Sequence, residues 1–232
     1  MATNCSRHDD QELEPSMLLI DMVHFRTMPV LAFILVGLVG TLAAPSVARG
    51  TPENDPKTTV MSTVAQATDI LKNHQAPQAV RRRELIQTIA GHFDFTDMAR
   101  SSLGYHWRQL AADQQQRFVR LFTAFLEDAY LNKLENYSGQ KIEFVAETST
   151  GPGDSQVSTK VIQPDRDQPI RLDYRLKQDG GDWKVYDVTV DNISIMANYR
   201  NQFDRVINHQ GFDALMKQMQ SKQQELVASL GK

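Results

Sequence analysis

The spacing of hydrophobic residues predicts a helical N-terminal half for this chain. The strongest pattern runs from Phe118 to Tyr130, where apolar side chains recur at i, i+3, i+4, i+7 and i+8 and include three phenylalanines. A capping residue just before Met98 marks the start of another helix. Together, these patterns predict helices over residues 58–74, 82–92, from about 95, and 113–136.

Beyond Gly139 the period of the hydrophobic residues changes from that of a helix to two. The resulting alternation predicts strands over residues 142–146, 157–161, 170–176 and 183–190. The tetrapeptide Asp-Gly-Gly-Asp at 179–182 predicts a tight hairpin between the last two strands. Within 183–190 the apolar parity slips by one residue, which indicates either a bulge or a strand buried on both faces. Two further helical patterns, over about 195–208 and from 212, close the chain.

These elements predict an α+β fold, in which helices pack on one face of a four-stranded, curved antiparallel sheet. The aromatic stripe of helix 113–136 is expected to oppose the inward side chains of that sheet. Those inward positions are Phe144, Val161, Leu172, Tyr174 and Trp183. Either an ordinary solid core or an enclosed apolar cavity would account for such bulky facing surfaces, and composition alone does not separate the two.

The N-terminal segment has the organisation of a secretory signal peptide. Fifteen uncharged residues, from Val30 to Ala44, follow Arg26, and Ser46 and Ala48 then fit the small-residue positions of a cleavage site. A membrane anchor is the alternative, but it requires roughly 20 apolar residues. The expected organisation is a leader and signal peptide at 1–48, a flexible lead-in at 49–57, and one α+β domain at 58–232 with helical N-terminal and C-terminal parts.

Charge and cysteine content exclude several classes of protein. The whole chain has 25 Lys and Arg against 28 Asp and Glu, and loss of residues 1–48 would leave 23 of each. A chain without net positive charge is not expected to bind nucleic acid. The single cysteine, Cys5, lies in the leader, so the exported chain would carry no disulfide.

The sequence offers little that would support catalysis or metal binding. The four histidines after the leader form no H-x-H or H-x-x-x-H pair, so no zinc site is expected. No nucleotide-binding loop or nucleophile elbow is present, and no cofactor is predicted. His92 and Asp94 could form an acid–base pair, although a Gly-His sequence is also typical of the end of a helix.

Short motifs along residues 58–220 occur in an order that is more specific than any one of them. They are Phe93-Asp94-Phe95, Leu103-Gly104 with Trp107, the Gln116–Tyr130 helix, Tyr137-Ser138-Gly139-Gln140, Arg171–Leu176, Trp183–Val188, Ile193-Ser194, Tyr199-Arg200, Gln202-Phe203 and Gly211. In this order the chain resembles the MlaC family of periplasmic phospholipid carriers, also known as the toluene-tolerance auxiliary family of ABC transport systems. One departure is Asn192, where the family pattern leads us to expect glycine; asparagine also tolerates a left-handed backbone.

The resemblance implies a cone-like fold related to nuclear transport factor 2, with an apolar pocket for acyl chains. It also implies a soluble periplasmic protein, not an enzyme, that carries a diacyl phospholipid as cargo and supports the lipid asymmetry of the outer membrane. The implied partners are an inner-membrane ABC transporter with a lipid-binding ring subunit and an outer-membrane lipoprotein complex.

Candidate lipid-binding residues follow from periodicity combined with proximity to these motifs. They are Trp107, Phe122, Phe125, Phe144, Leu172, Tyr174, Trp183, Val185, Val188, Ile195, Met196 and Tyr199.

Three alternatives to a phospholipid carrier remain open. The first is a carrier of another lipid such as a hopanoid, and the second is a periplasmic adaptor with a filled core. The third is an enzyme built on the same cone, for which Asp187 or Tyr174 would be the titrating group.

Overall fold

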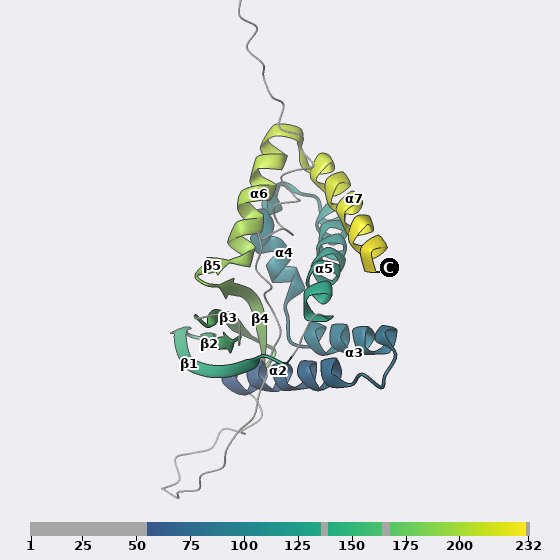
Figure 1. Cartoon of the computed structure of the whole chain (residues 1–232). Helices are drawn as coiled ribbons and strands as arrows, with labels where there is room; N and C mark the ends of the chain where they lie inside the picture. The colour runs from purple at the N-terminus through teal and green to yellow at the C-terminus, as the bar shows by residue number, and fades with distance from the viewer. Residues whose placement is uncertain (1–54, 136–138, 164–167, 231–232) are drawn as a thin grey trace, which may run out of the picture.

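The computed structural model describes residues 55–135, 139–163 and 168–230, coloured along the chain in Figure 1. The predicted signal peptide and most of the predicted lead-in lie outside these residues. The helices are α2 (Pro56–Lys72), α3 (Gln78–Ala90), α4 (Phe95–Leu103), the 3-10 helix η1 (Gly104–Gln109), α5 (Ala112–Glu135), α6 (Ile195–Gln210) and α7 (Phe212–Leu230). The strands are β1 (Lys141–Gly151), β2 (Asp154–Ile162), β3 (Ile170–Asp179), β4 (Asp182–Val190) and β5 (Ile193–Ser194).

The sheet is antiparallel throughout and follows the chain in the order β1-β2-β3-β4-β5. The predicted α+β class and antiparallel meander are confirmed, but the predicted strand number was one too low. The extra strand, β5, has only two residues and pairs with the end of β4. It is created by a tight turn in which Asp191 and Asn192 have φ values of 46° and 68°. Asn192 therefore adopts the left-handed conformation for which glycine was expected.

A bulge explains the slip in apolar parity along β4. Leu176 pairs with Val185 and Arg175 pairs with Asp187, so Tyr186 is the extra residue between the two pairs. The bulge keeps Val185 and Val188 on the same face of the sheet, although they are separated by an odd number of positions. Of the two interpretations of the sequence pattern, the bulge is the one found.

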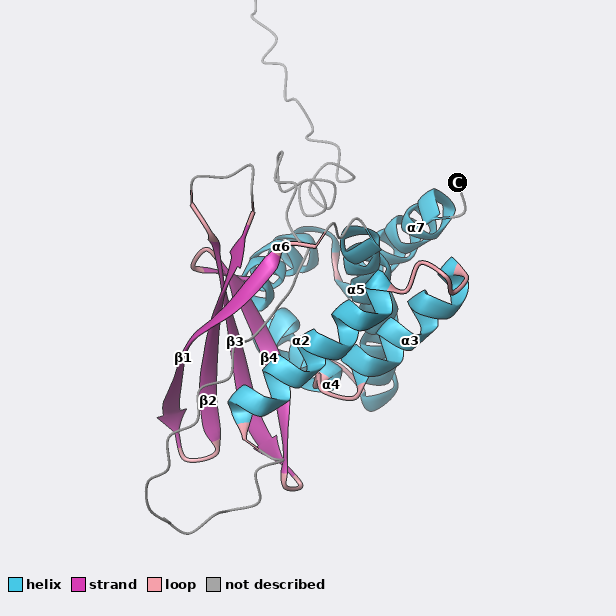
Figure 2. Ribbon diagram, turned by 60° about the horizontal axis from the view of Figure 1, so that its bottom comes forward, coloured by secondary structure: helices cyan, strands magenta, loops and turns pink. Residues whose placement is uncertain are grey.

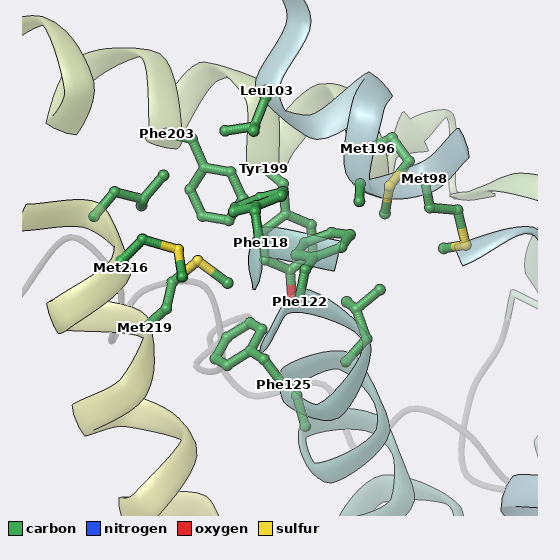
Figure 3. Packing of buried hydrophobic residues seen from close by; sticks show 14 of the residues in the cluster. Met98, Leu103, Phe118, Phe122, Phe125, Met196, Tyr199, Phe203, Met216 and Met219 are labelled. Atoms are coloured by element: carbon green, nitrogen blue, oxygen red, sulfur yellow. The ribbon is translucent and has the colours of Figure 1, made fainter. Parts of the chain in front are cut away.

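The helices lie on one side of the sheet, as Figure 2 shows, and the buried apolar residues form three clusters. The phenylalanines of the α5 stripe do not oppose the sheet as predicted, although Leu126 and Tyr130 of the same stripe line a cavity beside the sheet. Phe118, Phe122 and Phe125 instead pack with residues of α6 and α7 in a helical cluster, which Figure 3 shows from close by. The ring of Phe122, for example, meets that of Tyr199 edge-on with centroids 5.4 Å apart. A separate cluster covers the sheet and includes Val60 and Val64 of α2.

The segment before α4 ties the helical part to the sheet. The backbone N–H of Val185 donates to the carbonyl of His92, and the N–H of Asp94 donates to the carbonyl of Val185, both at 2.8 Å. Asp94 also caps α4 by accepting from the N–H of Asp97 at 2.8 Å. The ammonium group of Lys177 on β3 lies 2.8 Å from the carboxylates of both Asp94 and Asp97. These contacts fix the position of α4 against β4 and hold one wall of the cavity described below.

Candidate functional site

An apolar cavity of about 200 Å³ lies between the sheet and the helices α2, α3, α4 and α5, and it is partly open to solvent. Its wall combines residues that are more than 130 positions apart in the sequence. The lining residues are Thr63, Val64, Ala67, Thr68 and Leu71 of α2, Ile86 and Ile89 of α3, Phe93, Phe95 and Met98 around α4, Leu126, Glu127, Tyr130, Leu131 and Leu134 of α5, Leu172 and Tyr174 of β3, Val188 and Val190 of β4, and Ile195.

The threonines of this wall contribute apolar surface because their hydroxyl groups are satisfied within α2. The Thr63 hydroxyl donates to the carbonyl of Thr59 and the Thr68 hydroxyl donates to the carbonyl of Val64, each at 2.7 Å. The methyl groups are therefore the part of these side chains that is available to a ligand. Almost the whole cavity surface is hydrocarbon.

Two tyrosines of the wall stay neutral over the physiological pH range. Burial raises the pKa of Tyr130 to about 12, although a hydrogen bond with the Tyr199 hydroxyl acts in the opposite direction. Burial also raises the pKa of Tyr174 above its usual value. Neither phenol becomes a phenolate at neutral pH, so neither adds charge to the cavity.

Glu127 is the one charged residue among the described residues that line the cavity. Its side chain is half-buried on α5, next to Leu126 and one turn before Tyr130 and Leu131, which also line the cavity. Partial burial raises the pKa of its carboxyl group, and the neighbouring Asp128 raises it further. A carboxylate is thus held at an apolar surface without full hydration.

A cavity of this size would be costly if it stayed empty. At about 24 cal/mol per Å³, a closed and unfilled apolar void of about 200 Å³ destabilises a fold by roughly 5 kcal/mol, which is the upper limit for this partly open cavity. That figure is comparable with the whole stability of many domains, about 5–15 kcal/mol. An apolar ligand would restore the lost contacts, so the arrangement suits binding of hydrocarbon chains.

The structure brings four of the twelve predicted lipid-binding residues together at the cavity: Leu172, Tyr174, Val188 and Ile195. The remaining eight do not line it. Phe122, Phe125, Met196 and Tyr199 lie in the helical cluster and Trp107 packs against that cluster, while Val185 lies in the sheet cluster with Phe144 and Trp183 packed against it. Contact of the four lining residues with lipid stays a prediction.

The predicted and observed lining residues differ because α5 has two apolar faces rather than one. The face with Phe118, Phe122 and Phe125 meets α6 and α7, whereas Tyr130 and Leu134 belong to the face that turns toward the cavity. Sequence reasoning also missed the contribution of α2 and α3. The signal was present for α2, where Val64, Ala67 and Leu71 recur at helical spacing, but nothing local indicated what that face would meet.

Of the residues considered for catalysis, Asp94 and Asp187 have structural contacts, and Tyr174 lines the cavity as described above. Asp94 caps α4 and pairs with Lys177, as described above. The carboxylate of Asp187 accepts hydrogen bonds from the Ser194 hydroxyl at 2.6 Å and from the Met196 N–H at 3.1 Å, which anchors the start of α6. Asp187 is buried and is not among the lining residues of the cavity.

Within residues 55–135, 139–163 and 168–230, no three His, Cys, Asp or Glu side chains are grouped so that they could hold a metal ion. None of the helices in these same ranges combines the length and the hydropathy that a membrane span requires.

Comparison with known proteins gives consistent results. The chain is 30% identical over 121 residues to the intermembrane phospholipid transport system binding protein MlaC of Haemophilus influenzae, a match that covers 51% of this chain and 56% of that protein. It is 30% identical over 106 residues to the toluene tolerance protein ttg2D of Pseudomonas putida, covering 46% and 49% of the two chains. The matches thus span about half the length of these curated relatives.

The fold itself is shared with a solved structure. The phospholipid-binding protein from Ralstonia solanacearum, determined in complex with a phospholipid, superposes with a TM-score of 0.67 at 24% sequence identity. The superposition covers 75% of this chain and 99% of that one. Residues 61–221, well over half of the chain, match the sequence model of the family described as MlaC protein. The chain therefore belongs to the MlaC family.

Proposed function

We propose that this protein is a phospholipid carrier, which binds the acyl chains of a diacyl phospholipid at the cavity between its sheet and α2, α3, α4 and α5. The observation that carries the proposal is the hydrocarbon lining of this cavity, in a fold shared with a protein that was determined with phospholipid bound.

The need for such a carrier follows from the cost of exposing lipid tails to water. Each methylene costs about 0.8 kcal/mol, so the roughly 30 methylenes of two tails cost over 20 kcal/mol. A protein that covers the tails and leaves the polar head at an opening removes most of this barrier. Contact with hydrocarbon alone is non-directional, which suits a carrier that must also release its cargo.

The predicted signal peptide and the family membership support a place for this carrier in the periplasm. There it would exchange lipid with an inner-membrane ABC transporter bearing a lipid-binding ring and with an outer-membrane lipoprotein complex. The cargo would be a phospholipid rather than a hopanoid, because a known relative is named for intermembrane phospholipid transport.

Native mass spectrometry of the protein purified from a periplasmic extract without detergent tests the proposal. We expect a protein mass that corresponds to residues 49–232, together with an increment that equals a diacyl phospholipid and is released by organic solvent. A hopanoid increment would redirect the proposal to another lipid class. Protein that carries no lipid and takes none up from phospholipid vesicles would overturn it.

A further inference from the structure

The position of Glu127 on α5 places it at the edge of the cavity. Gln116, Arg120, Glu127 and Leu131 are separated by four, seven and four residues, so they follow one face of the helix. Along this face Gln116 and Arg120 are exposed, Glu127 is half-buried and Leu131 is buried. Glu127 therefore stands where the helix face passes from solvent into the cavity.

Its carboxylate is unusual among the groups around the cavity. It has no hydrogen-bond or ion-pair partner in the part of the chain that the structure describes, whereas the hydroxyls of Thr63 and Thr68 are satisfied within α2. Since almost the whole cavity surface is hydrocarbon, Glu127 contributes to the wall mainly through its methylenes rather than its carboxylate oxygens.

The electrostatic state of Glu127 suits it to meet a cation supplied by a ligand. Partial burial and the adjacent Asp128 both raise the pKa of Glu127, so its charged form is disfavoured in the free protein. An ammonium group placed near this carboxylate would relieve that unfavourable state, and a further negative charge would worsen it.

We propose, on the basis of the carrier function above, that Glu127 determines headgroup preference and favours phospholipids with a cationic amine over those with a net negative headgroup. When the tails occupy the cavity, we expect the head to stay at the half-buried edge of its wall, where Glu127 stands. The phosphodiester is common to both lipid classes, so its repulsion by the carboxylate cancels when the two are compared. The discrimination comes from the terminal group, an ammonium in phosphatidylethanolamine and a glycerol in phosphatidylglycerol.

Lipid competition tests this role directly. Full-length protein, processed by the cell and stripped of lipid, is incubated with vesicles of equimolar phosphatidylethanolamine and phosphatidylglycerol, and the bound lipids are extracted and quantified. Replacement Glu127→Gln is expected to lower the ratio of bound phosphatidylethanolamine to phosphatidylglycerol by about three- to tenfold, the effect of one partly screened charge pair. Glu127→Lys is expected to lower the ratio further, in favour of phosphatidylglycerol.

Asp128→Asn is the matched control, because it removes the same charge one residue away. The Asp128 carboxylate turns toward α7, where it accepts a hydrogen bond from Gln223 at 2.9 Å. This variant is expected to keep the wild-type lipid ratio. An unchanged ratio in Glu127→Gln, with lipid still bound, would overturn the headgroup role and leave the carrier function intact. An equal change in Asp128→Asn would also overturn it, by showing a general effect of net charge. Wild-type protein that binds neither lipid would overturn the carrier function and this inference together.

Discussion

Replacement of Val188 by tryptophan is expected to fill the cavity and so to affect stability and lipid binding in opposite directions. Val188 lies on β4 and lines the cavity. Val185, on the same face of the same strand, is 2% exposed, belongs to the sheet cluster and does not line the cavity. The same substitution at the two positions therefore compares filling of an empty space with insertion into a packed one.

The expected magnitudes follow from the volume of the cavity. An empty cavity of about 200 Å³ costs roughly 5 kcal/mol, which sets the ceiling for any gain. Tryptophan adds about seven non-hydrogen atoms to valine, worth at most about 5 kcal/mol at 0.8 kcal/mol per buried carbon. Imperfect fit and loss of rotamer freedom offset most of this, leaving a net stabilisation of about 1–2 kcal/mol for Val188→Trp. Val185→Trp should instead destabilise by about 1–3 kcal/mol, because overpacking strains a filled core.

Two assays on lipid-free protein measure these effects. Urea unfolding with linear extrapolation gives the free energy of unfolding of each variant. Native mass spectrometry after incubation with phospholipid vesicles gives the fraction of protein that carries lipid. Val188→Trp should unfold at a higher urea concentration than wild type and carry little lipid, since the indole occupies the space of the tails.

Either of two results would refute this reasoning. If Val188→Trp loses as much stability as Val185→Trp, then position 188 does not face open space. If Val188→Trp gains stability yet carries as much lipid as wild type, the cavity exists but is not where the lipid binds.

Three further substitutions examine the backbone, the cavity wall and its charge. Gly104 has φ +57°, and a Cβ at this position would lie 2.9 Å from Cδ of Arg200. Gly104→Ala should therefore strain the backbone and lower the free energy of unfolding in urea by about 1–3 kcal/mol. A loss under about 0.5 kcal/mol would show that alanine is accommodated there without backbone strain. Thr68→Val replaces the hydroxyl bonded to the Val64 carbonyl with a methyl group of similar size, so stability should change by less than about 1 kcal/mol and lipid uptake should be retained. Loss of uptake would indicate a polar role for Thr68. Because folding raises the pKa of Glu127, its ionisation opposes folding, and Glu127→Gln should raise the free energy of unfolding at pH 7 in lipid-free protein. That gain should disappear below the ordinary pKa of 4.5, where the carboxyl is protonated in both states, and a gain independent of pH would argue against ionisation as its cause.

Much of the secondary structure could be predicted because its signals are local. The stretches with a hydrophobic period of two correspond to β1 to β4. The Asp-Gly-Gly-Asp tetrapeptide forms the hairpin turn between β3 and β4, with Gly180 and Gly181 at φ 59° and 100°. The predicted helix at 113–136 differs by one residue at each end from α5. β5 was missed because two residues are too few to show a period.

The candidate site was predicted less completely, for a physical reason that α5 makes clear. Its aromatic stripe was the strongest apolar signal in the chain, and it was therefore assigned to the face opposite the sheet. Phe118, Phe122 and Phe125 are instead fully buried against α6 and α7, where bulky rings fill space completely. The cavity lies beside the flank of that stripe, where the side chains of Leu126, Tyr130, Leu131 and Leu134 leave a space toward the sheet unfilled.

Local patterns in the sequence established which segments form helices and which form β1 to β4, the antiparallel order of these strands, and the set of apolar faces that must be buried. These properties depend on periodicity, turn residues and capping groups, which act over a few residues. Which of these apolar faces meet and which stand apart follows from the fold as a whole. The wall of the cavity joins Thr63 on α2 to Ile195 at the start of α6, and such pairings depend on the relative placement of whole elements. Hydrophobic attraction is non-directional, so no local pattern specifies whether two apolar faces close on each other or enclose a space.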